Sequence, residues 1–330
     1  MANVGETIYT TLEMSIAVAC CLGNALVVWA VRTSVSLRQP TFCFIGSLAV
    51  ADFLVGAVAV PLAVLVDGRF EMSFYGCVFI SCVVIVLTQA SVYSLLAIAV
   101  DRYLRVYIPL RYKEKVKLKH SWVIIAACWV AATLLGFIPM FGWNNHGSLT
   151  PSNSTSIVCQ FLTVIPMSYL VNFTFLSCHL PSMMIMMVLY CCIFCMISQQ
   201  LRGGVAKATK SSAYYIKEQK LACSLALVLA LFAACWLPLH VMNTVEFYSQ
   251  GSRVPHEAFY VGILLSHANS AVNPVVYAFK VPKIKEAYQR ALRKLLPCQA
   301  EEQKDQSTPM ATMNASSQAN STAKSGTVLP

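Results

Sequence analysis

A few side chains that can ionise lie inside the apolar stretches of this 330-residue sequence. Asp52 lies in the run SLAVADF, Glu13 in the first apolar run and His267 in LLSHANSAVNP. An ionisable group in an apolar span is costly, so it usually faces a cavity or a partner. Asp52 could be neutralised by a proton, or it could share a cation with oxygen-bearing side chains.

Sodium is the cation that best suits a site made of Asp52 and oxygen-bearing side chains. A bundle with its polar faces turned inward could bring Asp52 together with Ser91, Asn269 and Asn273. Oxygen ligands with a single carboxylate suit Na⁺ better than a transition metal. We therefore predict an allosteric sodium ion at these four residues and no other cofactor.

These side chains must be positioned by apolar helices. Apolar residues make up 57% of the chain and charged residues 12%, whereas about a quarter of the residues in soluble domains are charged. An uncharged run such as 77–100 reaches about 36 Å as a helix, which is enough to cross a bilayer. Seven spans are predicted, at 8–31, 42–66, 77–100, 122–142, 168–197, 221–247 and 257–279. The expected fold is an all-α membrane protein, a seven-transmembrane helix bundle.

Basic residues set the expected orientation of the bundle. Of 24 Lys and Arg, 22 fall in the segments that a cytoplasmic C-terminus would place inside, so the positive-inside rule predicts an extracellular N-terminus. The net charge of +10 indicates inner-leaflet lipid and cytoplasmic partners, not nucleic acid. We expect an extracellular segment 1–7, the bundle at 8–279, an amphipathic cytoplasmic helix at 280–298 and a disordered tail at 299–330.

Three covalent modifications are predicted outside the apolar core. Cys77 and Cys159 are the two cysteines well placed on the oxidising side, where a disulfide would hold the longest outer loop over the bundle. Asn153 begins a glycosylation sequon in that loop. Cys298 follows the amphipathic segment and is a candidate for palmitoylation.

One face of the sixth span carries hydrogen-bonding groups. Trp236, His240 and Asn243 follow at i, i+4 and i+7 around Pro238. A stripe of this kind is core in most helices, but three polar groups beside a kink favour a cavity lining. The span is therefore predicted to line a site and to move.

Several motifs together resemble a known family. They are Asn24, Asp52, Asp101-Arg102-Tyr103, Trp122, Trp129, Cys235-Trp236-Leu237-Pro238 and Asn273-Pro274-Val275-Val276-Tyr277. With these motifs in order, residues 8–298 resemble the rhodopsin-like G-protein-coupled receptors. More narrowly, DRYLRVYIPLRYK, PMFGWNN, CWLPLH and LLSHANSAVNP resemble the adenosine receptors. The motifs CQF and GILLSHANS are most similar to the third subtype.

The resemblance implies a plasma-membrane receptor for extracellular adenosine that couples to an inhibitory G protein and lowers cyclic AMP. The implied ligand residues are Phe161 stacking on the purine, Asn243 at its edge, Ser266, His267 and Thr88 at the ribose, Glu13 orienting His267, Val84, Leu239 and Ile263 as walls, Trp236 as floor, and His240 and Leu162 beside them. The implied coupling residues are Asp101, Arg102, Tyr103, Tyr190 and Tyr277. Arrestin and receptor kinases would act on the Ser/Thr tail, and membrane lipid would surround the spans.

The sequence departs from the family pattern at three places. An acidic residue is usual where Leu162 stands, Asn where Thr174 stands, and Pro where Ser182 stands, with Pro181 beside it. A receptor for another small purine or amine is one alternative. A transporter would normally show internal repeats and more spans, and an intramembrane enzyme would need a nucleophile beside the Glu13 and His267 pair.

Overall fold

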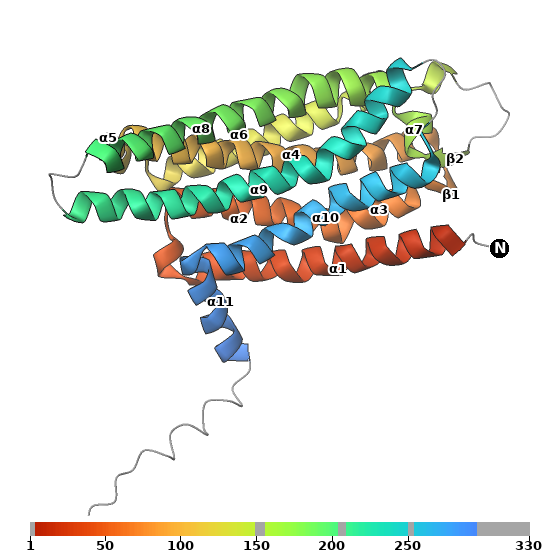
Figure 1. Ribbon diagram of the computed structural model, residues 1–330. Helices are drawn as coiled ribbons and strands as arrows, with labels where there is room; N and C mark the ends of the chain where they lie inside the picture. Colours follow the sequence, from red (N-terminus) through yellow and green to blue (C-terminus); the bar gives the residue numbers. More distant parts are fainter. Residues whose placement is uncertain (1–3, 149–155, 204–208, 250–253, 296–330) are drawn as a thin grey trace, which may run out of the picture. The chain divides into compact units, whose positions relative to one another are not determined.

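The computed structural model describes residues 4–148, 156–203, 209–249 and 254–295, which are mostly helical (Figure 1). The long helices are α1 Val4–Thr33, α2 Pro40–Leu54, α4 Phe74–Tyr107, α6 Leu118–Gly136, α8 Leu180–Gly203, α9 Thr209–Tyr248 and α10 His256–Lys280. A π-helical stretch, Val55–Ala59, joins α2 to α3 Val60–Leu65, and another, Tyr169–His179, precedes α8. The shorter elements are α5 Pro109–Lys115, α7 Phe161–Val164, α11 Pro282–Leu295, β1 Asp67–Met72, β2 Ile157–Gln160 and 3₁₀ turns at Val35–Leu37, Ile138–Phe141 and His146–Ser148.

The predicted all-α seven-helix bundle is confirmed. Within the described residues, six helices are long and apolar enough to cross a membrane. The seventh predicted span is α10, 25 residues long, which packs against α1 and α9. α10 is less apolar than the other six helices because it carries the polar residues of the LLSHANSAVNP motif. These residues are buried in the bundle and do not face lipid. All seven helices belong to one compact unit, residues 1–291.

Several helix ends differ from the predicted spans. α9 begins at Thr209, twelve residues before the predicted start at 221, because the helix continues beyond its apolar part. α1 begins at Val4, within the segment expected to precede the first span. In the fourth predicted span, α6 ends at Gly136, and a 3₁₀ turn containing Pro139 completes the span. The amphipathic helix α11 begins at Pro282, two residues after the predicted start at 280, and the predicted end at 298 lies outside the described residues.

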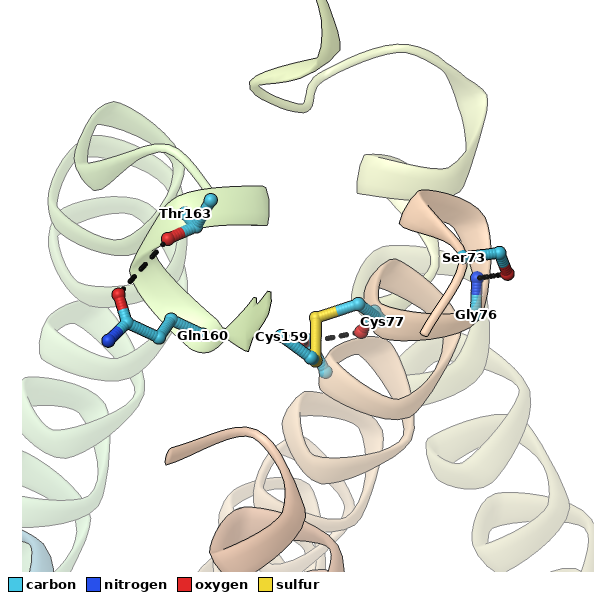
Figure 2. Close-up of a disulfide and its surroundings, with 7 residues drawn as sticks. Ser73, Gly76, Cys77, Cys159, Gln160 and Thr163 are labelled. Atoms are coloured by element: carbon cyan, nitrogen blue, oxygen red, sulfur yellow. Dashed lines mark hydrogen bonds between the residues drawn. A yellow bond between two sulfur atoms is a disulfide. The ribbon is translucent and has the colours of Figure 1, made fainter. Parts of the chain in front are cut away.

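The outer loop is held to the bundle by the predicted disulfide. Cys77 in the first turn of α4 is bonded to Cys159 of β2, with their Cα atoms 5.7 Å apart (Figure 2). β2 pairs antiparallel with β1, with Glu71 opposite Val158. Ser73 caps α4 by accepting a hydrogen bond from the Gly76 N–H at 3.2 Å. These contacts place α7, which follows β2, at the outer end of the bundle.

Small residues let the helices approach closely. A Cβ at Gly56 would lie 2.5 Å from the Cβ of Cys20 and 2.7 Å from the carbonyl oxygen of Ala17. Only glycine therefore fits where the first π-helical stretch meets α1, as expected for helices that pack through small residues in lipid. This contact brings Asp52, one turn earlier on α2, close to α1 and α10.

Candidate functional site

A small enclosed cavity lies between the spans at the depth of the Asp52 motif. Its lining comes from the second, third, sixth and seventh spans: Val55, Ala59, Thr88, Ser91, Trp236, Ser266, His267, Asn269 and Ser270. Its volume is about 10 Å³, room for roughly one water molecule. The cavity thus joins residues predicted for the ligand with residues predicted for sodium.

Asp52 is fully buried and is held by three hydrogen-bond donors. Its Oδ1 accepts from Ser91 Oγ at 3.1 Å and from Ser270 Oγ at 2.9 Å, and its Oδ2 accepts from Asn273 Nδ2 at 2.7 Å. The predicted partners Ser91 and Asn273 are therefore in place. Sequence reasoning missed Ser270, although its position four residues after Ser266 on the inward face was a usable signal.

Asn269, the fourth predicted cation ligand, makes no hydrogen bond to Asp52 in the part of the chain that the structure describes. Its side-chain oxygen Oδ1 is buried without a partner, and its side chain lines the same cavity as Ser91. An orphaned amide oxygen in a cavity that is also lined by Ser91, the partner of the Asp52 carboxylate, offers the oxygen chemistry that a small hard cation requires. In those residues no cluster of three His, Cys, Asp or Glu could hold another metal.

The Glu13 and His267 pair forms as predicted. Glu13 is fully buried, and its Oε2 lies 2.7 Å from Nδ1 of His267. The carboxylate fixes the ring so that His267 lines the cavity. No nucleophile lies in the cavity lining in a position to use this pair as a base, since Ser266 donates its hydroxyl to the carbonyl of Ile263 at 2.7 Å and Thr88 donates to that of Val84 at 3.0 Å.

The remaining predicted ligand residues do not line this cavity. Val84, Leu239, Ile263 and Asn243 are half-buried, and His240 is buried. Phe161 begins α7 and is tied to the bundle by its N–H, which donates to the carbonyl of Val66 at 3.0 Å. Leu162, the next residue, is 47% exposed. The structure thus brings together Thr88, Ser266, His267 and Trp236, the residues predicted for the ribose and the floor, and leaves those predicted for the purine outside the cavity lining.

Sequence reasoning missed a buried histidine in the fifth span. His179 ends the π-helical stretch, is 1% exposed and lies in T-shaped contact with the Trp236 ring, 5.9 Å between centroids. The signal was a single histidine in an otherwise apolar run.

Near the end of α4 opposite Cys77, Arg102 is buried between two carboxylates. Its guanidinium lies 2.8 Å from Asp101 Oδ2, as predicted, and 3.1 Å from Glu218 Oε2 on α9. Arg105 also pairs with Glu218, at 3.0 Å. Glu218 was missed, although a lone acid between Lys217 and Lys220 was a usable signal.

Two hydroxyl groups complete the shell around Asp101. Thr41 Oγ1 donates to Asp101 Oδ2 at 2.6 Å and also contacts Arg102, and Tyr112 donates to Oδ1 at 2.5 Å. Burial, together with the neighbouring Asp101 carboxylate, raises the pKa of Tyr112, so its hydroxyl stays protonated and donates. The carboxylate of Asp101 therefore accepts two hydrogen bonds that do not depend on Arg102.

Of the other predicted coupling residues, Tyr190 lies close enough to Arg102 and Asp101 to interact with their charges. Tyr190 and Tyr277 are buried, and the hydroxyl of Tyr277 has no hydrogen-bond partner within the described residues. Tyr103 stacks on Tyr107, 5.4 Å between ring centroids. Asn153, Cys298 and the tail lie outside the described residues.

The comparisons with known proteins agree with this arrangement. Residues 23–277 match the family model described as 7 transmembrane receptor (rhodopsin family). The chain is 42% identical over 300 residues to adenosine receptor A3 of Ovis aries, an alignment that covers 91% of this chain and 94% of the relative. It is 41% identical to adenosine receptor A3 of Canis lupus familiaris, covering 93% and 97%, and 40% identical to that of Bos taurus, covering 92% and 96%.

A match of this extent shows the family. It also excludes the transporter and intramembrane enzyme alternatives, because the match spans the bundle and carries the motifs of a receptor. The chain therefore belongs to the rhodopsin family of seven-transmembrane receptors and, within it, to the adenosine receptors.

Proposed function

We propose that this receptor binds extracellular adenosine within the bundle and activates an inhibitory G protein, which lowers cyclic AMP. The supporting observation is the single cavity lined both by Thr88, Ser266 and His267 and by Ser91 and Asn269. Ligand and cation would share this cavity, so one can change the binding of the other. The likeness to A3 receptors supports the G-protein class.

The nucleoside would enter from the outer end. Phe161 would stack on the purine, and the Asn243 amide, which can both donate and accept, matches the adenine edge. The ribose hydroxyls would meet His267 and Ser266. Since the cavity holds about one water molecule, the side chains around it must move apart when the ligand binds.

The sodium ion is part of this proposal. Asp52 and Ser91 would hold it, with the free oxygen of Asn269 as a further ligand and Asn273 beside the carboxylate. The chemistry that the ion supplies is a charge that neutralises Asp52 in one receptor state. With the N-terminus outside and the C-terminus inside, arrestin, receptor kinases and inner-leaflet lipid would meet the cytoplasmic face.

Agonist binding with and without guanine nucleotide tests the function. Membranes that contain the receptor and an inhibitory G protein should bind a labelled adenosine agonist in a high-affinity state that guanine nucleotide removes, because G-protein binding and agonist binding favour the same state. Antagonist binding should not respond. Agonist affinity that is indifferent to both G protein and nucleotide would contradict the proposal.

Glu218→Gln is expected to raise basal nucleotide exchange. Glu218 joins α9 to both Arg102 and Arg105. Glutamine keeps the shape of the side chain but removes its charge, which weakens hydrogen bonds that contribute about 1.5–3 kcal/mol each when a charged group makes them. This loss should shift the resting equilibrium toward the state in which α9 is released. Exchange without agonist is the measurement. Glu114→Gln, an exposed acid on α5, is the control and should leave the basal rate unchanged.

Leu162 should make the mouth of the site tolerant of bulk. A carboxylate there could accept a hydrogen bond from the exocyclic amine of adenine, worth about 1.5–3 kcal/mol, and leucine cannot. Adenosines with a large apolar group on that amine should therefore lose little affinity or gain, relative to adenosine. Leu162→Glu should shift preference toward the unsubstituted amine. The same ranking of ligands in both proteins would show that Leu162 does not face the ligand.

A further inference from the structure

Three buried polar side chains from three different spans form a hydrogen-bonded chain beside Trp236. Nδ1 of His179 lies 2.9 Å from Nε2 of His240 on α9, and Nε2 of His179 is hydrogen-bonded to Oε1 of Gln89 on α4. Gln89 in turn bonds the hydroxyl of Tyr93 through its Nε2 at 3.1 Å. His179 is therefore the central member of the chain, with both ring nitrogens engaged.

The π-helical stretch explains why His179 points inward. Pro181 has no N–H, and its ring would clash with the carbonyl of Ser177 in a regular α-helix. The stretch Tyr169–His179 is wound as a π-helix, in which the backbone repeat is one residue longer. The Ser177 hydroxyl follows the same spacing and donates to the carbonyl of Asn172, five residues earlier, at 2.7 Å.

The chain of hydrogen bonds determines where protons sit. With the Gln89 amide donating to Tyr93, its oxygen accepts from Nε2–H of His179. Nδ1 of a neutral His179 is then an acceptor, so the proton on His240 must lie on Nε2. Nδ1 of His240 is left as an acceptor. If the Gln89 amide flips so that its oxygen accepts from Tyr93, donor and acceptor exchange roles in every hydrogen bond of the chain. Nδ1 of His240 then becomes a donor.

His240 lies between two aromatic rings next to the proposed ligand site. Its ring stacks between Phe175, at 4.4 Å between centroids, and Trp236, at 5.6 Å. Trp236 lines the cavity, and Asn243, the proposed purine ligand, lies three residues further on the same helix face. Stacking fixes the plane of the His240 ring, and the bond to His179 fixes its rotation in that plane.

We propose that His179 is a positioning residue of the nucleoside site, which orients the His240 ring and sets whether its free nitrogen accepts or donates a hydrogen bond. His179 acts through His240 and does not itself touch the ligand. The inference rests on the proposed function, because it assumes that His240 faces adenosine. If His179 served only to fill space between the spans, its effect on binding would not depend on His240.

A double-mutant cycle separates these roles. The full-length receptor, His179→Phe, His240→Phe and the double variant are compared for adenosine affinity by competition with a labelled antagonist, whose own saturation shows how much receptor is folded. Each single variant should weaken adenosine about tenfold, the effect of about one hydrogen bond, and the double variant should bind like His240→Phe alone. An additive loss of about 100-fold would overturn the proposal.

Two further variants sharpen the cycle. His179→Gln keeps a donor and an acceptor and should recover most of the affinity lost in His179→Phe, whereas equal losses in both would count against the proposal. Leu176→Phe places the same new ring on the same π-helical stretch, at a residue that is 39% exposed. It should bind adenosine like the unmodified receptor.

Nitrogen-15 NMR of the histidine rings tests the same step without adenosine. The chain has six histidines, so the His240 signals can be assigned by their loss in His240→Phe. The ratio of the two neutral tautomers of His240, with the proton on Nδ1 or on Nε2, should differ between His179→Phe and the unmodified receptor. Unchanged signals would overturn the proposal. Failure of the wild-type receptor to bind adenosine would instead overturn the proposed function, and the spectra would still decide the role of His179.

Discussion

Replacing Arg102 with alanine is expected to abolish agonist-stimulated nucleotide exchange while antagonist binding stays at the wild-type level. Arg102 is 2% exposed and is held by Asp101 and Glu218, so in this state it cannot meet a partner. We infer that the ligand shifts the bundle toward a state in which Arg102 is released to the G protein. Alanine removes the group that would make this contact.

The surroundings of Arg102 indicate that the variant should still fold. Glu218 keeps its pair with Arg105, and Asp101 keeps the hydrogen bonds from Thr41 and Tyr112. Neither carboxylate is left buried without a partner, which is the usual reason that such a substitution is severely destabilising. Antagonist binding should therefore report an intact bundle.

The measurement is exchange of labelled guanine nucleotide on added G protein, at saturating agonist. Arg38→Ala is the matched control, because Arg38 is exposed in the turn between α1 and α2, and it should keep most of the exchange. Preserved exchange in Arg102→Ala would refute this role for the arginine.

Most of the fold could be predicted from local sequence. Uncharged runs of membrane length gave the helices, and the distribution of cysteines gave the Cys77 to Cys159 bond. The cluster of Asp52, Ser91 and Asn273 was predictable because buried polar groups in lipid must find one another. Some predicted helix ends were wrong, such as the start of α9, which was predicted at 221 and lies at Thr209. Hydropathy indicates where a helix crosses the membrane and not where the helix ends.

What could not be predicted depends on pairing and on backbone geometry. Glu218 belongs to a basic segment, and only the folded bundle brings it to Arg102, 116 residues earlier in the chain. His179 was missed because a π-helical stretch rotates the residues after it, and an apolar run has the same appearance in either helix type. Ser270 was missed because its position in the sequence indicates the inward face of α10 but not that its hydroxyl meets Asp52.

The second large effect concerns sodium. In the unmodified receptor, Na⁺ should lower agonist affinity by roughly 5- to 150-fold, the usual range of allosteric coupling, without lowering antagonist affinity. An ion that binds the resting state must be opposed by a ligand that favours the other state, and the coupling is reciprocal. Asp52→Asn should abolish the response, because it removes the only carboxylate that accepts from Ser91, Ser270 and Asn273.

The experiment compares NaCl with N-methylglucamine chloride at equal ionic strength, so that screening of surface charge cancels and only the ion differs. Glu257→Gln, an exposed acid at the start of α10, should keep the full sodium response and so separates the buried site from surface acids. Asn269→Ala should weaken the response without abolishing it, since it removes the orphaned oxygen but leaves the Asp52 carboxylate. A sodium response that is unchanged in Asp52→Asn would place the ion elsewhere, and the shared cavity would then have no part in coupling cation to ligand.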